Sequence, residues 1–93
     1  MVVPVELPSE ILDDLQKRLR RAEGQIRGIQ GMLEDKRDCR DIVTQLSAVI
    51  SALEQTGFKL VATGLTWCIN HPEEAKADGL GVDEVQKLFM KLT

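Results

Sequence analysis

Apolar residues recur every three or four positions through the first third of the chain. They are Leu12, Leu15, Leu19, Ala22, Ile26, Ile29 and Leu33. This sustained spacing is typical of a straight amphipathic helix in a bundle or coiled coil. Ser9 precedes the apolar run and follows Pro8, which is the place of an N-cap residue. The pattern predicts a helix over about residues 9–35.

A second apolar stripe begins after a short polar turn. Its members are Cys39, Ile42, Val43, Leu46, Ile50, Leu53, Leu60, Val61 and Cys68. Asp38 is a favourable N-cap for this helix. His71 and Pro72 end it, because the residue before a proline disfavours the α conformation. The pattern predicts a long helix over about residues 39–70.

The rest of the chain contains a polar stretch and a third apolar stripe. Residues 73–81, EEAKADGLG, are expected to form a linker closed by glycine. The spacing of Val82, Val85, Leu88, Phe89 and Leu92 predicts a shorter helix over about residues 82–92. The sequence therefore predicts an all-α fold with two long helices and one short helix, in a single domain spanning residues 1–93.

The length of the second predicted helix indicates self-association. A helix over residues 39–70 is about 50 Å long, whereas a compact chain of this size has a radius of gyration of about 12 Å. One chain cannot cover the apolar stripe of such a helix. We therefore expect an obligate homo-oligomer.

Charge is unevenly distributed along the chain. The net charge is −3, but residues 17–40 hold eight basic side chains against four acidic ones, a local net charge of +4. Such a stretch can bind a polyanion if oligomerisation aligns several copies of it, although a solvated helix face would have the same composition. The N-terminus lacks the pattern of a signal peptide, and no apolar run has the length of a membrane span, so a cytoplasmic protein without a membrane partner is expected.

The two cysteines are too far apart to meet within one subunit. Cys39 and Cys68 stand 29 residues apart on one predicted helix, or about 43 Å, whereas a disulfide requires about 4.4–6.8 Å between α-carbons. In an antiparallel dimer, Cys39 of one chain faces Cys68 of the other. Cys39 lies in the first helical turn, which favours the thiolate, and is the candidate nucleophile; Cys68 lies in the last turn and suits the resolving role. Two inert core residues remain an alternative.

Metal binding and catalysis receive little support from the sequence. Two thiolates suit Cu(I), but the single histidine, His71, follows the helix end and is expected to be an exposed capping residue. A third ligand would be expected one turn before Cys68, where the chain has Gly64. No phosphate-binding loop or catalytic triad is recognisable, so we expect no enzyme, no cofactor and no metal site, with Cu(I) at Cys39 and Cys68 as the alternative.

Residues 18–54 contain RLRR-A-EGQ, a DC turn and TQLSAV, beginning at Arg18, Asp38 and Thr44. This stretch strongly resembles the copper-sensing operon repressor family of bacterial transcription factors. The resemblance implies antiparallel helical dimers that pair into tetramers and bind operator DNA without a helix-turn-helix. By the same resemblance Arg18 contacts DNA, with Arg20, Arg21 and Gln25 as its neighbours. Lys59, one turn beyond the position where many relatives carry an arginine in the second helix, is a further candidate DNA contact.

The resemblance also bears on the signal that the protein detects. Copper sensors of the family present Cys, His and Cys where this chain has Cys39, Gly64 and Cys68. The pattern resembles the persulfide-sensing branch, in which two cysteines of different subunits become linked by two to four sulfur atoms and the repressor leaves its DNA. This implies derepression of sulfur-detoxification genes by reactive sulfur species. A Cu(I)-responsive repressor and a helical scaffold protein with inert cysteines remain alternatives.

Overall fold

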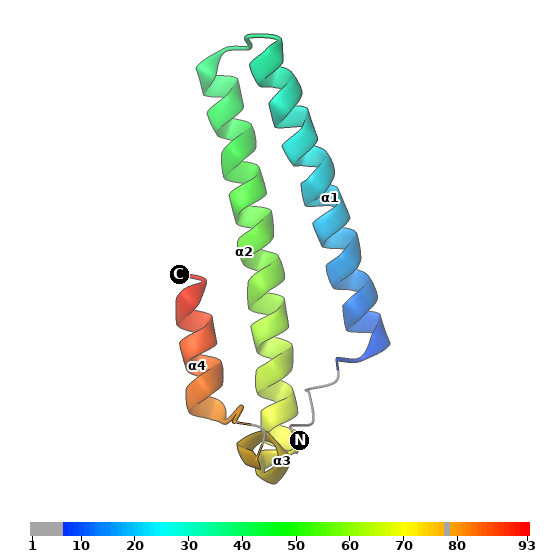
Figure 1. The fold of residues 1–93 in the computed structure, drawn as a ribbon, viewed down its shortest axis with the longest axis vertical. Coiled ribbons are helices and arrows are strands. Elements are labelled where there is room, and N and C mark those ends of the chain that lie inside the picture. Colours follow the sequence, from blue (N-terminus) through cyan, green and yellow to red (C-terminus); the bar gives the residue numbers. More distant parts are fainter. Residues whose placement is uncertain (1–6, 78) are drawn as a thin grey trace.

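The computed structural model describes residues 7–77 and 79–93 and is entirely helical over them, which confirms the predicted fold class. Helices α1 (Ser9–Glu34) and α2 (Cys39–Asn70) form a long antiparallel hairpin. A short helix, α3 (Pro72–Ala77), and helix α4 (Val82–Lys91) then turn back along the lower half of α2 (Figure 1). The molecule is elongated, with extents of 54 × 25 × 21 Å.

The ends of the long helices follow local chemistry. Asp38 caps α2 as expected, since its carboxylate accepts a hydrogen bond of 2.8 Å from the backbone N–H of Arg40. The prediction for α1 is wrong by one residue: Pro8 occupies the N-cap position without a side-chain cap, and Ser9 is already helical. Lys36 adopts a left-handed backbone conformation (φ 54°) in the turn that joins the two helices.

The segment expected to be a linker contains the additional helix α3, which is a correction. Pro72 is its first residue, where a proline needs no N–H partner and its fixed φ suits a helix. Glu73 and Glu74 in the first turn and Lys76 in the last turn complement the helix dipole. Only a short turn therefore separates α3 from α4, and α4 ends at Lys91 rather than at residue 92.

Few side chains are buried in the single chain. Two small groups lie between the helices: Leu15, Ala22, Ile29, Val49 and Thr56 along the hairpin, and Cys68, Ala75 and Val85 at its lower end. Most of the apolar stripe residues remain exposed, including Leu12, Leu19, Ile26, Leu33, Val43, Leu46, Ile50 and Leu53. No helix of the described residues is long and apolar enough to cross a membrane.

Candidate sensing thiols and DNA-binding surface

Cys39 is the first residue of α2 and is exposed. Its neighbouring arginines are engaged locally: Arg40 pairs with Asp38 at 2.8 Å, and Arg37 pairs with Asp41 at 3.7 Å. Both of these arginines therefore have a carboxylate beside them. Accessibility and the helix N-terminus are the features that support Cys39 as the reactive thiol.

Cys68 lies in the last turn of α2 and has the opposite environment. Only 3% of the residue is exposed, and it packs against Ala75 of α3 and Val85 of α4. Its Sγ donates a hydrogen bond of 2.8 Å to the backbone carbonyl of Leu80. Burial raises the pKa of the Cys68 thiol, because the charged thiolate loses its hydration there. In this conformation Cys68 is held as a neutral thiol.

The structure keeps the two thiols at opposite ends of α2, as the sequence predicts. The helix is continuous from Cys39 to Asn70, and its two ends lie near opposite ends of the molecule (Figure 1). At 1.5 Å per residue the α-carbons of Cys39 and Cys68 are separated by about 43 Å. A bond between them within one chain is therefore excluded, whereas their pairing between subunits remains a prediction.

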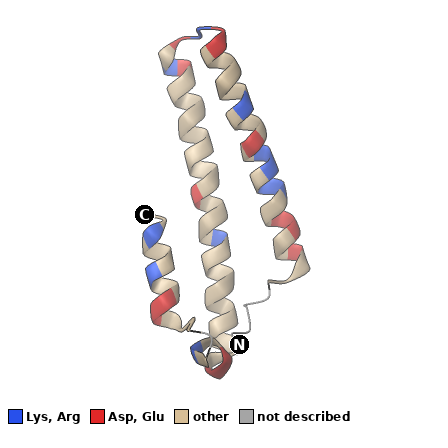
Figure 2. Cartoon of the chain, viewed as in Figure 1, with Lys and Arg blue, Asp and Glu red and all other residues tan. Residues whose placement is uncertain are grey.

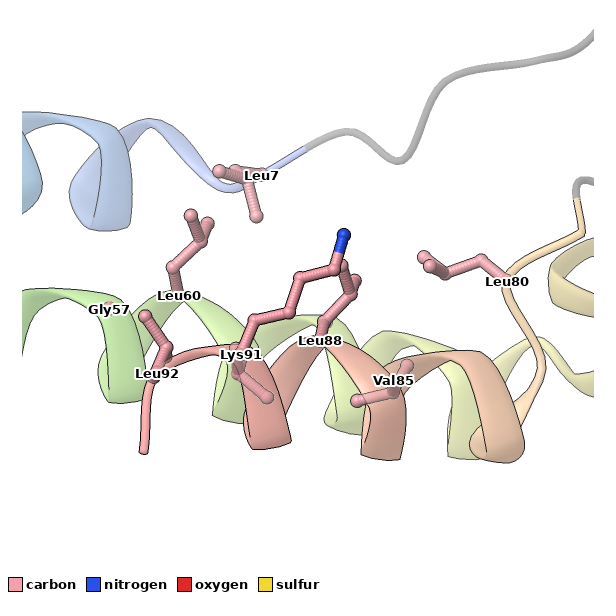
Figure 3. A pocket seen from close by; sticks show the side chains of 10 residues that line it. Leu7, Gly57, Leu60, Leu80, Val85, Leu88, Lys91 and Leu92 are labelled. Atoms are coloured by element: carbon pink, nitrogen blue, oxygen red, sulfur yellow. The ribbon is translucent and has the colours of Figure 1, made fainter.

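The position expected for a third metal ligand is open and apolar. A Cβ atom placed on Gly64 would meet nothing within 4 Å. Gly64 borders a groove of about 390 Å³ between α2 and α4, where Leu60, Leu80 and Leu88 gather (Figure 3). A Cβ atom fits at this position, but glycine provides no ligand there.

His71 directly follows the last residue of α2. It is the exposed C-cap residue of α2, as predicted, and its ring stacks on Trp67 with a centroid distance of 5.0 Å. Its Nδ1 lies 3.1 Å from the carbonyl oxygen of Trp67. Within residues 7–77 and 79–93, no three His, Cys, Asp or Glu side chains are close enough to share a metal ion.

Two of the residues expected to contact DNA meet at one carboxylate. The Asp14 carboxylate accepts from Arg18 of its own helix at 2.8 Å and from Lys59 of α2 at 2.7 Å. These hydrogen bonds, first that of Lys59 and then that of Arg18, lower the pKa of Asp14. Arg18 and Lys59 therefore lie side by side although they are far apart in the sequence. Asp14 was not among the residues predicted from the sequence, although its position four residues before Arg18 was a usable signal.

The remaining predicted DNA contacts differ in accessibility. Arg20 and Arg21 are exposed on α1, and in the part of the chain that the structure describes neither makes a salt bridge. Figure 2 shows several basic segments along α1, with acidic segments among them. Gln25 is half-buried, and its Oε1 is buried without a hydrogen-bond partner among the described residues. The oxygen of Gln25 is thus turned away from solvent, unlike the two guanidinium groups.

Comparison with known proteins gives consistent matches over most of the chain. Residues 12–91 match the family model of the metal-sensitive transcriptional repressors. The copper-sensing transcriptional repressor RicR of Mycobacterium tuberculosis is 47% identical over 57 residues, which span 61% of this chain and 59% of RicR. The copper-sensing transcriptional repressor CsoR of Bacillus subtilis is 35% identical over 81 residues, 87% of this chain and 80% of that protein.

A solved structure shows the same fold. The copper-sensing repressor CsoR with Cu(I) from Geobacillus thermodenitrificans aligns with a TM-score of 0.69 at 36% sequence identity. The alignment covers 96% of this chain and 90% of the solved chain. The likeness therefore includes both long helices and the C-terminal segment.

Proposed function

The chain belongs to the metal-sensitive transcriptional repressor family, and from this premise we propose that it binds operator DNA and is released when Cys39 and Cys68 react. Its relatives are transcriptional repressors rather than enzymes. The observation that carries the proposal is the placement of two thiols, one exposed and one buried, at opposite ends of a continuous helix. A change at these thiols can alter how two subunits fit together.

A homo-oligomer is part of this proposal. The exposed apolar stripe residues of α1 and α2 require another surface, and a second copy of the chain offers the same stripe. In an antiparallel pairing of two α2 helices, Cys39 of one subunit lies near Cys68 of the other, twice per dimer. Two such dimers can form a tetramer.

For the signal we propose a persulfide, on the basis of Gly64. Position 64 carries no ligand, and among the described residues of one chain no group of three His, Cys, Asp or Glu side chains could hold a metal ion. The Cys39 thiolate attacks the outer sulfur of a persulfide RSSH, forming Cys39–SSH and releasing RS⁻. The Cys68 thiolate of another subunit then attacks the inner sulfur, forming a disulfide and releasing HS⁻. The persulfide sulfur is the oxidant, and it leaves as sulfide.

A Cu(I)-responsive repressor is the second candidate, favoured by the relatives named above, which are described as copper-sensing. In this alternative the Cys39 and Cys68 thiolates of two subunits hold Cu(I) as a pair of soft ligands. Such a site would lack the third protein ligand, so we expect it to bind Cu(I) weakly.

One experiment compares the two signals. The reduced protein on operator DNA is treated with a polysulfide, with Cu(I) under a competing thiol, or with buffer, and DNA release is followed by fluorescence anisotropy. Non-reducing mass spectrometry then identifies the products. We expect release by the polysulfide together with an intersubunit link between Cys39 and Cys68. Release by Cu(I) alone, with no linked chains after polysulfide, would replace the persulfide proposal with the copper one.

The proposed DNA surface consists of Arg20 and Arg21 with the adjacent pair Arg18 and Lys59. Their cationic groups suit phosphate contacts, which give binding that weakens strongly with salt. An operator shift assay with wild type and Arg18→Ala tests this surface. A helical scaffold protein with inert cysteines would give no salt-sensitive shift with either protein.

A further inference from the structure

The segment after α2 folds back over the end of that helix. Ala75 of α3 is 1% exposed and Val85 of α4 is 3% exposed, and both pack on Cys68. This small cluster is flanked by Val61, Trp67 and Leu80. Helices α3 and α4 therefore both pack against the buried Cys68.

A pair of hydrogen bonds connects the thiol to this segment. The Leu80 backbone N–H donates to the carbonyl of Ala75 at 2.8 Å, which fixes the turn after α3. The Leu80 carbonyl in turn accepts from the Cys68 Sγ at 2.8 Å. A thiol that donates its proton to a carbonyl is in the form that does not attack sulfur, since the thiolate is the nucleophile. Cys39 has no comparable enclosure and is exposed.

The packing beside Cys68 leaves room for movement. A pocket of about 520 Å³, open to the surface, lies between α2, α3 and the start of α4, with Cys68 and Ala75 among its lining residues. Lys76 and Glu84 also line it, so part of its wall is polar. A shift of α3 or α4 into this space would not require a dense core to be disrupted.

We propose that α3, the turn at residues 79–81 and α4 form a cover that prevents Cys68 from reacting. The hydrogen bond from the Cys68 thiol to the Leu80 carbonyl holds this cover in place. Within the function proposed above, on which this inference rests, the cover imposes an order. The exposed Cys39 takes up the sulfur first. Cys68 attacks the modified Cys39 of another subunit only after the cover has moved and the thiol has left the Leu80 carbonyl.

The cover is tested by alkylation, without any sulfur donor or DNA. The full, reduced chain is treated with N-ethylmaleimide, the reaction is quenched at intervals, and the modification of each cysteine is measured by peptide mass spectrometry. We expect Cys39 to react more than about tenfold faster than Cys68, because the thiol of Cys68 is reached only through local opening. Cys39 of the same chain serves as an internal standard.

Two variants separate the cover from other causes of slow reaction. Val85→Ala and the milder Ala75→Gly both loosen the packing on Cys68, and Met90→Ala is the matched control at an exposed position of α4. Val85→Ala and Ala75→Gly should raise the alkylation rate of Cys68 several-fold and leave that of Cys39 unchanged. Met90→Ala should change neither rate. If Val85→Ala loses its helical circular dichroism, Ala75→Gly decides the test.

Two results would overturn the cover. One is equal alkylation of Cys39 and Cys68 in the wild type. The other is a slow Cys68 whose rate does not respond to either loosening variant, which would mean that another subunit encloses it. A protected Cys68 that responds to the variants, in a protein that polysulfide does not link, would retain the cover and reject the persulfide function.

Discussion

Gly64 is the single residue on which the choice of signal depends. It stands one turn before Cys68 on the same side of α2, and its Cα faces open space beside the apolar groove. A Cβ atom at this position therefore meets no steric obstacle among the described residues. Position 64 therefore lacks a metal ligand because it is a glycine, and not because neighbouring atoms exclude a Cβ.

This residue yields a prediction for copper binding. Gly64→His should place an imidazole four residues before Cys68 and raise the Cu(I) affinity by more than about tenfold. Mutating a residue that only supports a metal ligand already changes metal affinity by about tenfold or more, and a direct ligand should have a larger effect. Competition with a Cu(I) chelator of known affinity measures the change. Gly64→Ala is the matched control, because it removes the glycine without adding a ligand. Equal Cu(I) affinity in the three proteins would show that position 64 does not face the site.

The buried thiol yields a prediction for pH dependence. The pKa of Cys68 is raised above the ordinary value of 9.0 in the folded chain, so on raising the pH the unfolded chain loses this proton first. The stabilisation is complete below the ordinary pKa and is lost as the pH rises through the raised pKa. The free energy of unfolding in urea, at one protein concentration, should therefore fall in alkaline solution. Cys68→Ala should reduce this fall, whereas Cys39→Ala should retain it.

At the scale of elements, the heptad stripe of α1 divides into two sets. Leu15, Ala22 and Ile29 are spaced by seven residues and are buried against α2. The other set, Leu12, Leu19, Ile26 and Leu33, has the same spacing and is 43–60% exposed. One set of positions thus builds the hairpin, and the other remains available to a further subunit.

Asp14 connects the two long helices and yields a prediction for DNA binding. Its carboxylate holds Arg18 and Lys59, two of the cations proposed to contact phosphate. Asp14→Asn removes one negative charge from this surface, so operator affinity should increase. The dependence of log affinity on log salt concentration should become steeper by about one unit for each of the two cations that gains a phosphate contact.

Asp13, the neighbour of Asp14, provides the control for the Asp14→Asn prediction. Asp13 is exposed on α1, and among the described residues its carboxylate makes no salt bridge. Asp13→Asn changes the net charge equally and should have the smaller effect. If both variants bind the operator with the same affinity and salt dependence, the positions of Arg18 and Lys59 around Asp14 have no part in DNA binding.

The sequence was sufficient for elements with long apolar repeats and insufficient for contacts between distant segments. Helices α1 and α2 were located within one residue at each end, because their stripes extend over many turns. Helix α3 was missed because its six residues carry no apolar period, although a proline followed by two glutamates is a helix start. The burial of Cys68 depends on that helix, and the Lys59–Asp14 pair joins residues 45 positions apart, so neither could be read from local spacing.

At the scale of the whole molecule, the chain is more elongated than a compact globular chain of its length. Its radius of gyration is 17.1 Å, well above the value of about 12 Å for a compact chain of this length. The long hairpin buries little of its apolar surface by itself. We therefore expect contacts between subunits to stabilise α1 and α2, and we expect DNA binding by aligned basic stretches to depend on the same contacts.

A substitution in the exposed heptad set of α1 tests whether stability and DNA binding depend on contacts between subunits. Leu19→Glu places a charge on the stripe where Leu19 is 46% exposed, and burial of that charge against another subunit would be costly. Sedimentation velocity should then show smaller assemblies than the wild type, with a lower unfolding temperature and weaker operator binding. Gln16→Glu introduces the same side chain on an exposed, polar position of α1 and should leave the assembly intact. A Leu19→Glu protein with wild-type assembly would mean that this stripe is not a subunit interface, and the second set of heptad positions would then need another explanation.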